Sequence, residues 1–506
     1  MEFQKGAISS VIHPSSFILT LACPIALIWT VQHDPFFWDT VQLASKHAHH
    51  FYENSLRWTP LPAEIDSGHP PVFGLYLACA WTFFGKTLPV SHWAMLPFLL
   101  GIVALLHRLG QQFSLSLSPY WLLPLVLLDP VLAGQLTLVS PDVVLAFFFL
   151  LAIDSILGRR ALLLAISILG LCAISMRGMM TAGALFLWTL ALRNAEWRIR
   201  NAEYGAQSGL FRIPYSAFRI PYSAFRIPHS ALAFIPGFIF AAWFLWWHWQ
   251  ATGWIGYHPG SAWAPAFEQA QGWEILRNLA VVAWRWLDFG RVFEWILMAL
   301  ILRKFWLSKN NFQFYKRSSL FIPWLLLLIC LLLLLTPSAV MYRNLSAHRY
   351  FLPGFLVLHL LFFQWISIVK WSNRKKEWLL TALIAGMATG NLWVYPAGIS
   401  MDWDSTLAHQ PYHRLRAEAL AFLDKERVDF QAVGSAFPNL NTGENLLLNG
   451  DPRHFAELDW ERNTYVLASN IFNDLSAADH ERLRRDWNLQ FRQVHAGVWV
   501  EIYRRR

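Results

Sequence analysis

Residues 324–335 read WLLLLICLLLLL and carry no charged side chain. A second uncharged run, LAFIPGFIFAAWFLWW, covers residues 232–247. Runs of this kind are typical of membrane helices, because the hydrocarbon core of a bilayer disfavours charge. The composition agrees, since 56% of the 506 residues are hydrophobic and only 14% are charged, which is little for a soluble protein. The sequence therefore predicts a polytopic membrane protein.

Apolar segments recur along the first 400 residues, and we expect about eleven of them to span the membrane. The expected spans lie near residues 14–31, 90–107, 119–138, 143–157, 160–176, 178–192, 232–250, 290–306, 319–336, 351–369 and 378–396. Two other segments are expected to lie in the outer interface as helices. Pro70–Phe84 is short for a span, and Trp273–Phe289 mixes Arg277, Arg285 and Asp288 with aromatic residues.

Clusters of basic residues set the expected orientation. They lie at residues 158–160, 193–226, 303–317 and 374–376. Because basic loops favour the cytoplasmic side, we expect a cytoplasmic N-terminus, with Asp39 and Asp142 outside. An odd number of spans then puts the C-terminus outside. A short repeat at 211–231 begins FRIPYSA and reads as a tandem duplication in a basic cytoplasmic linker.

The C-terminal tail differs in composition from the rest of the chain. Residues 402–506 hold 16 of the 32 acidic and 13 of the 41 basic residues, so the tail has net charge −3 and the remainder +12. Tyr412–Lys425 is helix-like, while Thr464–Ala468 and Val498–Tyr503 are strand-like. We therefore expect a membrane domain over 1–400, with its first outer loop at 32–89, and an extracytoplasmic α/β domain over 401–506. The excess positive charge belongs to loops beside the membrane and requires no nucleic-acid partner.

Acidic residues at the outer ends of spans are the first candidates for chemistry, because a carboxylate there is unfavourable unless it is paired or used. Asp39 follows the first span, and Asp142 opens another. The first outer loop also contains Asp34 and several histidines. His47, His50 and Glu53 would share one helix face, but a zinc site needs a better-defined third ligand, so a divalent metal is left open and not favoured. For any single residue of this loop, a solvated side chain without a role is the favoured interpretation.

Cationic groups form the second set of candidates. Arg343, His348 and Arg349 precede an outer span end, and Arg177 lies at another. An outer arginine anchors to lipid headgroups or binds a phosphate, since guanidinium forms paired hydrogen bonds to phosphate oxygens. Outer carboxylates beside such cations suit a substrate that carries a phosphate and loses it.

The order of these motifs resembles that of membrane glycosyltransferases that include the protein O-mannosyltransferases and the lipid A aminoarabinose transferases. Asp39 precedes His69-Pro70-Pro71 by thirty residues, and aromatic residues follow. The other matching elements are Ser140-Pro141-Asp142, Arg177-Gly178 and Arg349-Tyr350-Phe351-Leu352-Pro353. The resemblance covers roughly residues 15–400. The chain has Thr40 where the family carries a second acid after Asp39, and His69 where it carries a lysine.

The resemblance implies an all-α membrane domain of the C-type glycosyltransferase fold in a bacterial inner membrane. It implies inverting transfer of a sugar from a polyprenyl-phosphate donor to a hydroxyl of a lipid, glycan or protein on the outer face. Asp39 would be the general base, Asp142 would orient a substrate, and the donor site would use Asp34, His69, Arg177, Arg343, His348, Arg349 and Tyr350. A transporter or flippase of lipid-linked sugars is the alternative, and it predicts charges deep within spans. Such mid-span charges are expected to be nearly absent. An envelope scaffold is a third alternative.

Overall fold

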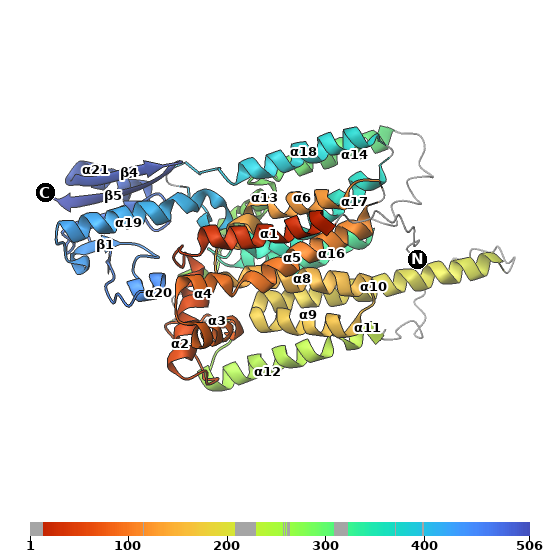
Figure 1. The fold of residues 1–506 in the computed structure, drawn as a ribbon, viewed down its shortest axis with the longest axis horizontal. Coiled ribbons are helices and arrows are strands. Elements are labelled where there is room, and N and C mark those ends of the chain that lie inside the picture. The colour runs from red at the N-terminus through yellow and green to blue at the C-terminus, as the bar shows by residue number, and fades with distance from the viewer. Residues whose placement is uncertain are drawn as a thin grey trace.

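The computed structural model is mostly helical, with a small sheet near the C-terminus (Figure 1). It describes residues 14–114, 116–207, 229–256, 258, 260, 264–307, 322–369, 371–396 and 399–506. Residues 211–228 of the short repeat lie outside the described residues. In the basic stretch before it, the structure describes the backbone of residues 193–207 but not their side chains. Long helices run side by side, and the sheet lies at one end of the bundle (Figure 1).

Helices form at each segment expected to span the membrane. They are α1 (Pro14–Val31), α5 (Leu96–Phe113), α6 (Leu122–Leu127) with α7 (Pro130–Leu136), α8 (Pro141–Leu157), α9 (Ala161–Ile174), α10 (Met176–Gln207), α12 (Ile235–Thr252), α14 (Val292–Leu307), α16 (Ile322–Met341), α17 (Leu352–Ile368) and α18 (Asn373–Gly390). Among the described residues, three helical stretches are long and apolar enough to cross a membrane by themselves, namely Leu88–Phe113, Ile322–Met341 and His348–Ile368. A bent pair, Pro119–Leu127 with Pro130–Leu136, makes a fourth. The count of about eleven spans stays a prediction.

The segment 119–138, which we expected to be one helical span, is formed by two helices with a break between them. Its two halves meet at an angle of 77°. Asp129 accepts hydrogen bonds from the backbone N–H groups of Val131 and Leu132 at 2.9 and 3.2 Å, and so begins a new helix. Pro130 occupies the first position of that helix, where its missing N–H has no cost. The Asp-Pro pair therefore explains the break.

Helix α17 is at the centre of the bundle. Helix α17 lies within the helical stretch His348–Ile368. The most apolar part of this stretch is 94% buried inside the protein. By contrast, α16 and α12 expose large apolar side chains such as Leu333, Ile239 and Trp246. A helix that is apolar on all sides and buried on all sides belongs to the core of a bundle, and its neighbours carry the exposed apolar surface. The bundle is thus built around α17.

The first outer loop folds into short helices instead of a solvated coil. They are the π-helical turn η1 (Val41–Lys46), α2 (His47–Glu53), α3 (Val72–Phe84) and α4 (Leu88–Trp93). Helix α13 (Trp273–Leu287) has one exposed face with Trp273, Leu276 and Trp284 and buries Arg285 on the other. This amphipathic pattern is that expected of an interfacial helix. The placement of α3 and α13 relative to a bilayer stays a prediction.

The tail forms a five-stranded sheet of order β2-β1-β3-β5-β4. The strands are β1 (Val433–Ser435), β2 (Ala456–Glu457), β3 (Tyr465–Ser469), β4 (Trp487–His495) and β5 (Val498–Arg505), with α19 (Gln410–Lys425), α20 (Gly443–Leu447) and α21 (Ala477–Asp486). Strand β1 runs parallel to β2 and β3, whereas β5 runs antiparallel to β3 and β4. The predicted helix and both predicted strands are present, and the expectation of mixed α/β structure is confirmed.

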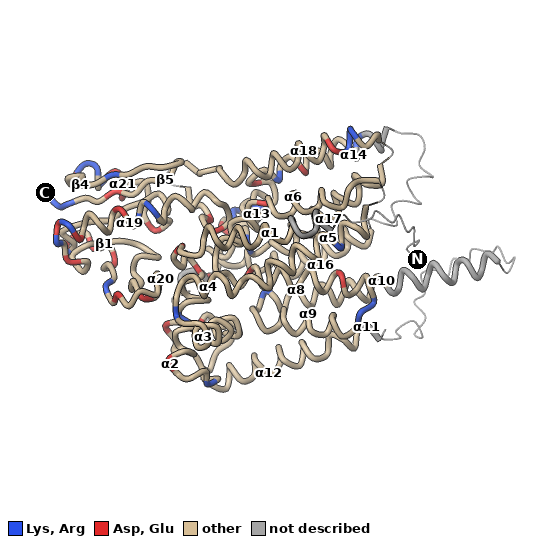
Figure 2. Tube along the Cα trace, in the orientation of Figure 1, with Lys and Arg blue, Asp and Glu red and all other residues tan. Residues whose placement is uncertain are grey.

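The tail is docked on the first outer loop. Ser45 donates a hydrogen bond to the carbonyl of Asn445 at 2.6 Å, and Glu444 contacts both His49 and Lys86. Basic segments of α14 and α18 lie at the other end of the bundle, away from the sheet (Figure 2). This separation agrees with the expected placement of basic loops and tail on opposite sides, a sidedness that stays a prediction.

Candidate active site

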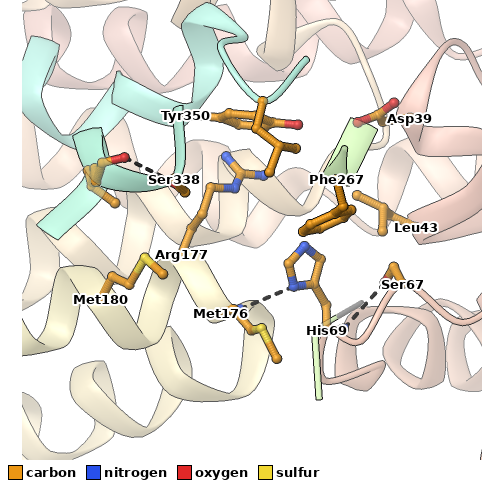
Figure 3. A pocket seen from close by; sticks show the side chains of 13 residues that line it. Asp39, Leu43, Ser67, His69, Met176, Arg177, Met180, Phe267, Ser338 and Tyr350 are labelled. Carbon is orange, nitrogen blue, oxygen red and sulfur yellow. Dashed lines mark hydrogen bonds between the residues drawn. The ribbon is translucent and has the colours of Figure 1, made fainter. Parts of the chain in front are cut away.

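A cavity of about 130 Å³ opens where the first outer loop meets the ends of α10 and α16 (Figure 3). Its polar wall comprises Asp39, Ser67, His69, Arg177, Ser338 and Tyr350. Its apolar wall comprises Leu43, Met176, Met180, Phe267, Leu335 and Leu345. Four of the residues selected from sequence therefore share one wall, although they come from four separate segments. A mostly apolar cavity with a few converging polar groups is the usual form of a ligand site.

Asp39 is placed by a tight turn after α1. The Thr40 hydroxyl donates to the carbonyl of Phe37 at 2.7 Å and accepts from its N–H at 2.9 Å, which closes the turn. Trp38 has a φ of 53°, a left-handed conformation that costs a bulky residue on the order of 1 kcal/mol. Burial raises the pKa of Asp39, an effect opposed by the Arg349 and Arg177 guanidinium groups and supported by Asp142. A carboxylate with raised proton affinity is a better general base than a solvated one.

Arg349 is held among three carboxylates. Its two terminal nitrogens contact Asp39 and Asp404, and its Nε lies 3.6 Å from an oxygen of Asp142. The residue is only 4% exposed and is not part of the cavity wall. Arg349 therefore orders the carboxylates. Its predicted contact with a donor phosphate gains no support from this geometry.

Arg177 is the guanidinium that faces the cavity. Its Nη2 pairs with Asp142 at 2.8 Å, and its charge lies over the Tyr350 ring, 4.6 Å from the centroid. The neighbouring Gly178 is required by packing, because a Cβ there would lie 1.9 Å from the carbonyl oxygen of Leu171. The Arg-Gly pair thus lets α10 start against α9 and point the arginine inward.

His69 lies on the opposite side of the cavity from Tyr350 (Figure 3). Burial and the charge of Arg177 lower the pKa of His69 to about 3, so the imidazole is neutral at pH 7. Its Nδ1 accepts from the backbone N–H of Met176 at 3.4 Å, which leaves the proton on Nε2. Figure 3 shows this second nitrogen turned away from Met176 toward Phe267. His69 can therefore donate a hydrogen bond to an anion in the cavity.

Asp142 faces a second, smaller cavity of about 10 Å³, which also touches His47, His69 and Arg177. Its carboxylate pairs with Arg177 and lies near Arg349, while its N–H donates to Ser140 at the start of α8. Asp142 and Asp39 therefore lie on two sides of the same pair of guanidinium groups. This convergence agrees with the expectation that both acids share one side of the bundle.

Besides Arg349 and Asp142, three more of the selected residues lie outside the cavity wall, namely Arg343, His348 and Asp34. Arg343 pairs with Glu268 and Glu274 on an exposed surface, at 2.7 and 3.0 Å. His348 is buried between Asp288 and Asp402, at 2.9 and 2.7 Å.

Asp34 lies at the junction with the tail, where burial raises its pKa to about 6. The assignment of Asp34, Arg343 and His348 to substrate binding gains no support from their positions.

Asp404 is the functional candidate that the sequence analysis missed. It lies in the turn between the last helix of the bundle and α19, is 1% exposed, and is fixed by Gln135, whose amide donates to its carbonyl at 2.8 Å. The Asp402-Trp403-Asp404 doublet directly after the last predicted span was the available signal, because it repeats the pattern that singled out Asp39.

Metal binding gains no support from the described residues, in which no three His, Cys, Asp or Glu side chains are grouped to hold an ion. His47 bonds to the carbonyl of Ile65 at 2.9 Å and His50 to the hydroxyl of Thr59 at 2.9 Å. The histidines of the predicted helix face therefore bind partners other than a metal ion.

The fold and site define a helical bundle with an acid–arginine cluster beside a largely apolar cavity. No protein-family model matches the chain, and no curated protein sequence matches it. Among solved structures, the chain is similar to ArnT from Cupriavidus metallidurans, crystallised bound to undecaprenyl phosphate. That likeness covers 97% of this chain and 98% of the other, at 11% identity and a TM-score of 0.47, which is too distant to support a function.

Proposed function

We propose that the chain is an inverting membrane glycosyltransferase that moves a sugar from a polyprenyl-phosphate donor to an acceptor hydroxyl on the outer face of the membrane. The observation that carries this proposal is the convergence of Asp39, Arg177 and His69 on one cavity. A base, a cation and a neutral hydrogen-bond donor are the groups that transfer away from a phosphate requires. The sequence motifs that contain these residues support the same reaction.

In the proposed step, Asp39 removes the proton of the acceptor hydroxyl. The hydroxyl oxygen attacks the anomeric carbon, and the bond from that carbon to the phosphate oxygen breaks on the opposite face. The leaving group is a polyprenyl phosphate, so it requires charge stabilisation more than protonation. Arg177 and the Nε2–H of His69 are the groups placed to provide it, while Asp142 orients the acceptor or the sugar.

The apolar wall of the cavity suits the lipid part of the donor. Met176 and Met180 of α10 and Leu335 of α16 all line the cavity, and Met180 is 37% exposed at the surface of the bundle. Methionine adapts its shape to an irregular apolar partner. A prenyl chain would therefore reach the surrounding bilayer between these two helices while its phosphate stays at Arg177.

A transporter or flippase requires charges within the bundle, which the sequence analysis expected to be nearly absent. That expectation was wrong for one network, in which Arg291 pairs with Asp129 at 2.6 Å and His359 bridges Asp129 and Glu294. All four side chains are fully buried, bond to one another, and do not line the cavity formed by the described residues. They make a buried network that does not open onto this cavity, so the enzyme is favoured.

The test is consumption of a lipid-linked sugar by the purified protein, followed by mass analysis of the product. We expect the wild-type chain to release undecaprenyl phosphate from an undecaprenyl-phosphate sugar when an envelope extract supplies acceptors. The Asp39→Asn protein should bind the donor without releasing the lipid. Movement of intact donor across a proteoliposome membrane, without release of lipid phosphate, would instead indicate a flippase.

A further inference from the structure

His69 is carried by a turn that is fixed from outside the cavity. Asp66 accepts a hydrogen bond from the backbone N–H of Gly68 at 2.8 Å through one carboxylate oxygen. Its other oxygen lies 2.9 Å from Nε2 of His248. Gly68 has a φ of 70°, so the turn takes a conformation that favours glycine. The carboxylate thus closes the turn that presents Ser67 and His69 to the cavity.

His248 connects this turn to the end of α12. Its Nδ1 lies 3.0 Å from the carbonyl oxygen of Trp254. The Trp254 ring meets the imidazole edge-on at 4.6 Å. A Cβ on Gly68 would lie 3.0 Å from the Cα of Gly256, which itself lines the cavity. Two segments of cavity wall therefore meet at the Asp66–His248 pair.

Neither member of the pair touches the cavity, although both are nearly fully buried. The bond that His69 itself makes to Met176 is long, at 3.4 Å, and holds the ring only weakly. A second anchor lies just upstream, where His47 bonds to the carbonyl of Ile65. The position of the His69 ring is thus set largely by the turn, and the turn is set by Asp66 and His248.

We propose that Asp66 and His248 are positioning residues that hold the His69 imidazole for the phosphate of the lipid donor. This inference rests on the proposed function. The pair does not contact the donor. It keeps the Nε2–H of His69 at a fixed place across the cavity from Arg177, so that both groups meet the same anion. Such a pair should act only through His69, and that dependence separates it from a purely structural contact.

A double-mutant cycle tests this dependence. Binding of undecaprenyl phosphate to the full-length protein in detergent is measured for Asp66→Ala, His248→Ala and His69→Ala and for their combinations. We expect each single change to weaken binding roughly 10-fold. An effect of this size lies within the range of coupling energies between contacting groups. In the His69→Ala background, the other changes should add less than about 2-fold. Losses that multiply in that background would overturn the inference.

Conservative variants keep the test independent of folding. Asp66→Asn retains an oxygen for the Gly68 N–H, and His248→Gln retains a donor for Asp66, so both should fold and bind more tightly than the alanine variants. Glu444→Gln is the matched control, because it removes a contact between the tail and the first loop away from the cavity. It should leave undecaprenyl phosphate binding unchanged.

A second measurement does not depend on the donor. In histidine-selective ¹⁵N solid-state spectra, the His69 line is identified by its loss in His69→Ala. Asp66→Asn and His248→Gln should shift or broaden this line, whereas Glu444→Gln should not. A His69 line unchanged in both variants would overturn the positioning role. Failure of the wild-type protein to bind undecaprenyl phosphate, with the line still sensitive to both changes, would instead overturn the proposed function and keep the pair.

Discussion

Two of the clusters of buried charge in the described part of the chain differ in whether they border a cavity. The outer cluster joins Asp39, Asp142 and Asp404 to Arg177 and Arg349, and part of it lines a cavity. The inner network joins Asp129, Arg291, His359 and Glu294, all of them fully buried. Both contain arginine–carboxylate pairs at similar distances. Burial and ion pairing therefore do not distinguish a reactive site from a structural one, whereas contact with a cavity does.

The inner network has a structural task that the outer cluster lacks. Asp129 begins α7 after the break, Arg291 precedes α14, and His359 lies in the central helix α17. Joining three helices at one point fixes the bend between α6 and α7. The Arg291 guanidinium also lies 3.9 Å from the centroid of the Phe355 ring. Substitutions in the two clusters should consequently fail in different ways, and this difference can be measured.

The largest effect is expected at Asp39. Asp39→Asn keeps the size of the side chain but cannot accept the acceptor proton, so we expect transfer to fall ~10²–10⁴-fold. Donor binding and the midpoint of thermal unfolding should change little. Transfer is followed by release of lipid phosphate from the donor. Near-normal turnover of the variant would move the base to another carboxylate of the outer cluster.

The pH dependence of transfer gives a separate view of the same group. Burial raises the pKa of Asp39, and a base must be deprotonated to act, so the acidic limb of the transfer profile should lie above the ordinary value of 3.8. His69, with its pKa near 3, should contribute no change between pH 5 and 9. An acidic limb at or below the ordinary value would contradict Asp39 as the base.

Substitutions in the inner network should lower the stability of the protein. Asp129→Asn leaves Arg291 buried without its carboxylate, and breaking a buried pair in this way costs about 3–5 kcal/mol. Turnover per folded molecule should stay normal. Thermal unfolding in detergent measures the loss, and the double variant Asp129→Asn with Arg291→Met should recover part of it because neither charge remains. Lost turnover in a protein of normal stability would place this network in the reaction.

A smaller effect should separate the two arginines of the outer cluster. Arg177→Lys keeps the charge at the cavity but loses the paired hydrogen bonds, so we expect donor affinity to fall roughly 10-fold. Arg349→Lys cannot reach three carboxylates at once. We expect it to lower turnover roughly 10²-fold by releasing Asp39, with a lesser effect on donor affinity. Free exchange of Arg349 for Lys would show that the placement of Asp39 does not depend on the three contacts of the guanidinium group.

The order of motifs predicted much of the polar wall of the cavity, because helices that begin at the same end of a bundle bring their first residues together. Asp39, His69, Arg177 and Tyr350 meet for this reason. The partners of Arg349 were not predictable in the same way. Asp39 lies 310 positions away and Asp404 55 positions away, and the second contact depends on how the tail docks.

The inner network was missed for a different reason. Hydrophobic periodicity reports which residues avoid water, and it contains no information on which buried charges pair across helices. The Asp129-Pro130 pair did carry a signal for a helix start, since a capping acid followed by proline is the usual beginning of a helix. The surrounding leucines obscured it. The sequence analysis therefore predicted neither the helix break nor the network that stabilises it.

The smallest expected effect concerns Asp34, which the sequence analysis assigned to the substrate and the structure places at the junction with the tail. Burial raises its pKa from 3.8 to about 6, while Gln410 of the tail opposes this with a hydrogen bond. A carboxyl with a raised pKa binds its proton more tightly in the folded state. Its contribution to stability is therefore complete below pH 3.8 and is lost as the pH rises through 6.

Asp34→Asn cannot ionise, so it should stabilise the protein at pH 8 by on the order of 1 kcal/mol, a value reduced for partial exposure to solvent, and by nothing near pH 4. Thermal unfolding at both pH values measures the difference, and Glu53→Gln on the exposed face of α2 is the matched control. Transfer should be unaffected, because Asp34 lies outside the cavity wall. A gain of equal size at both pH values would show that this carboxyl does not titrate near 6, whereas a loss of transfer would return Asp34 to the outer cluster.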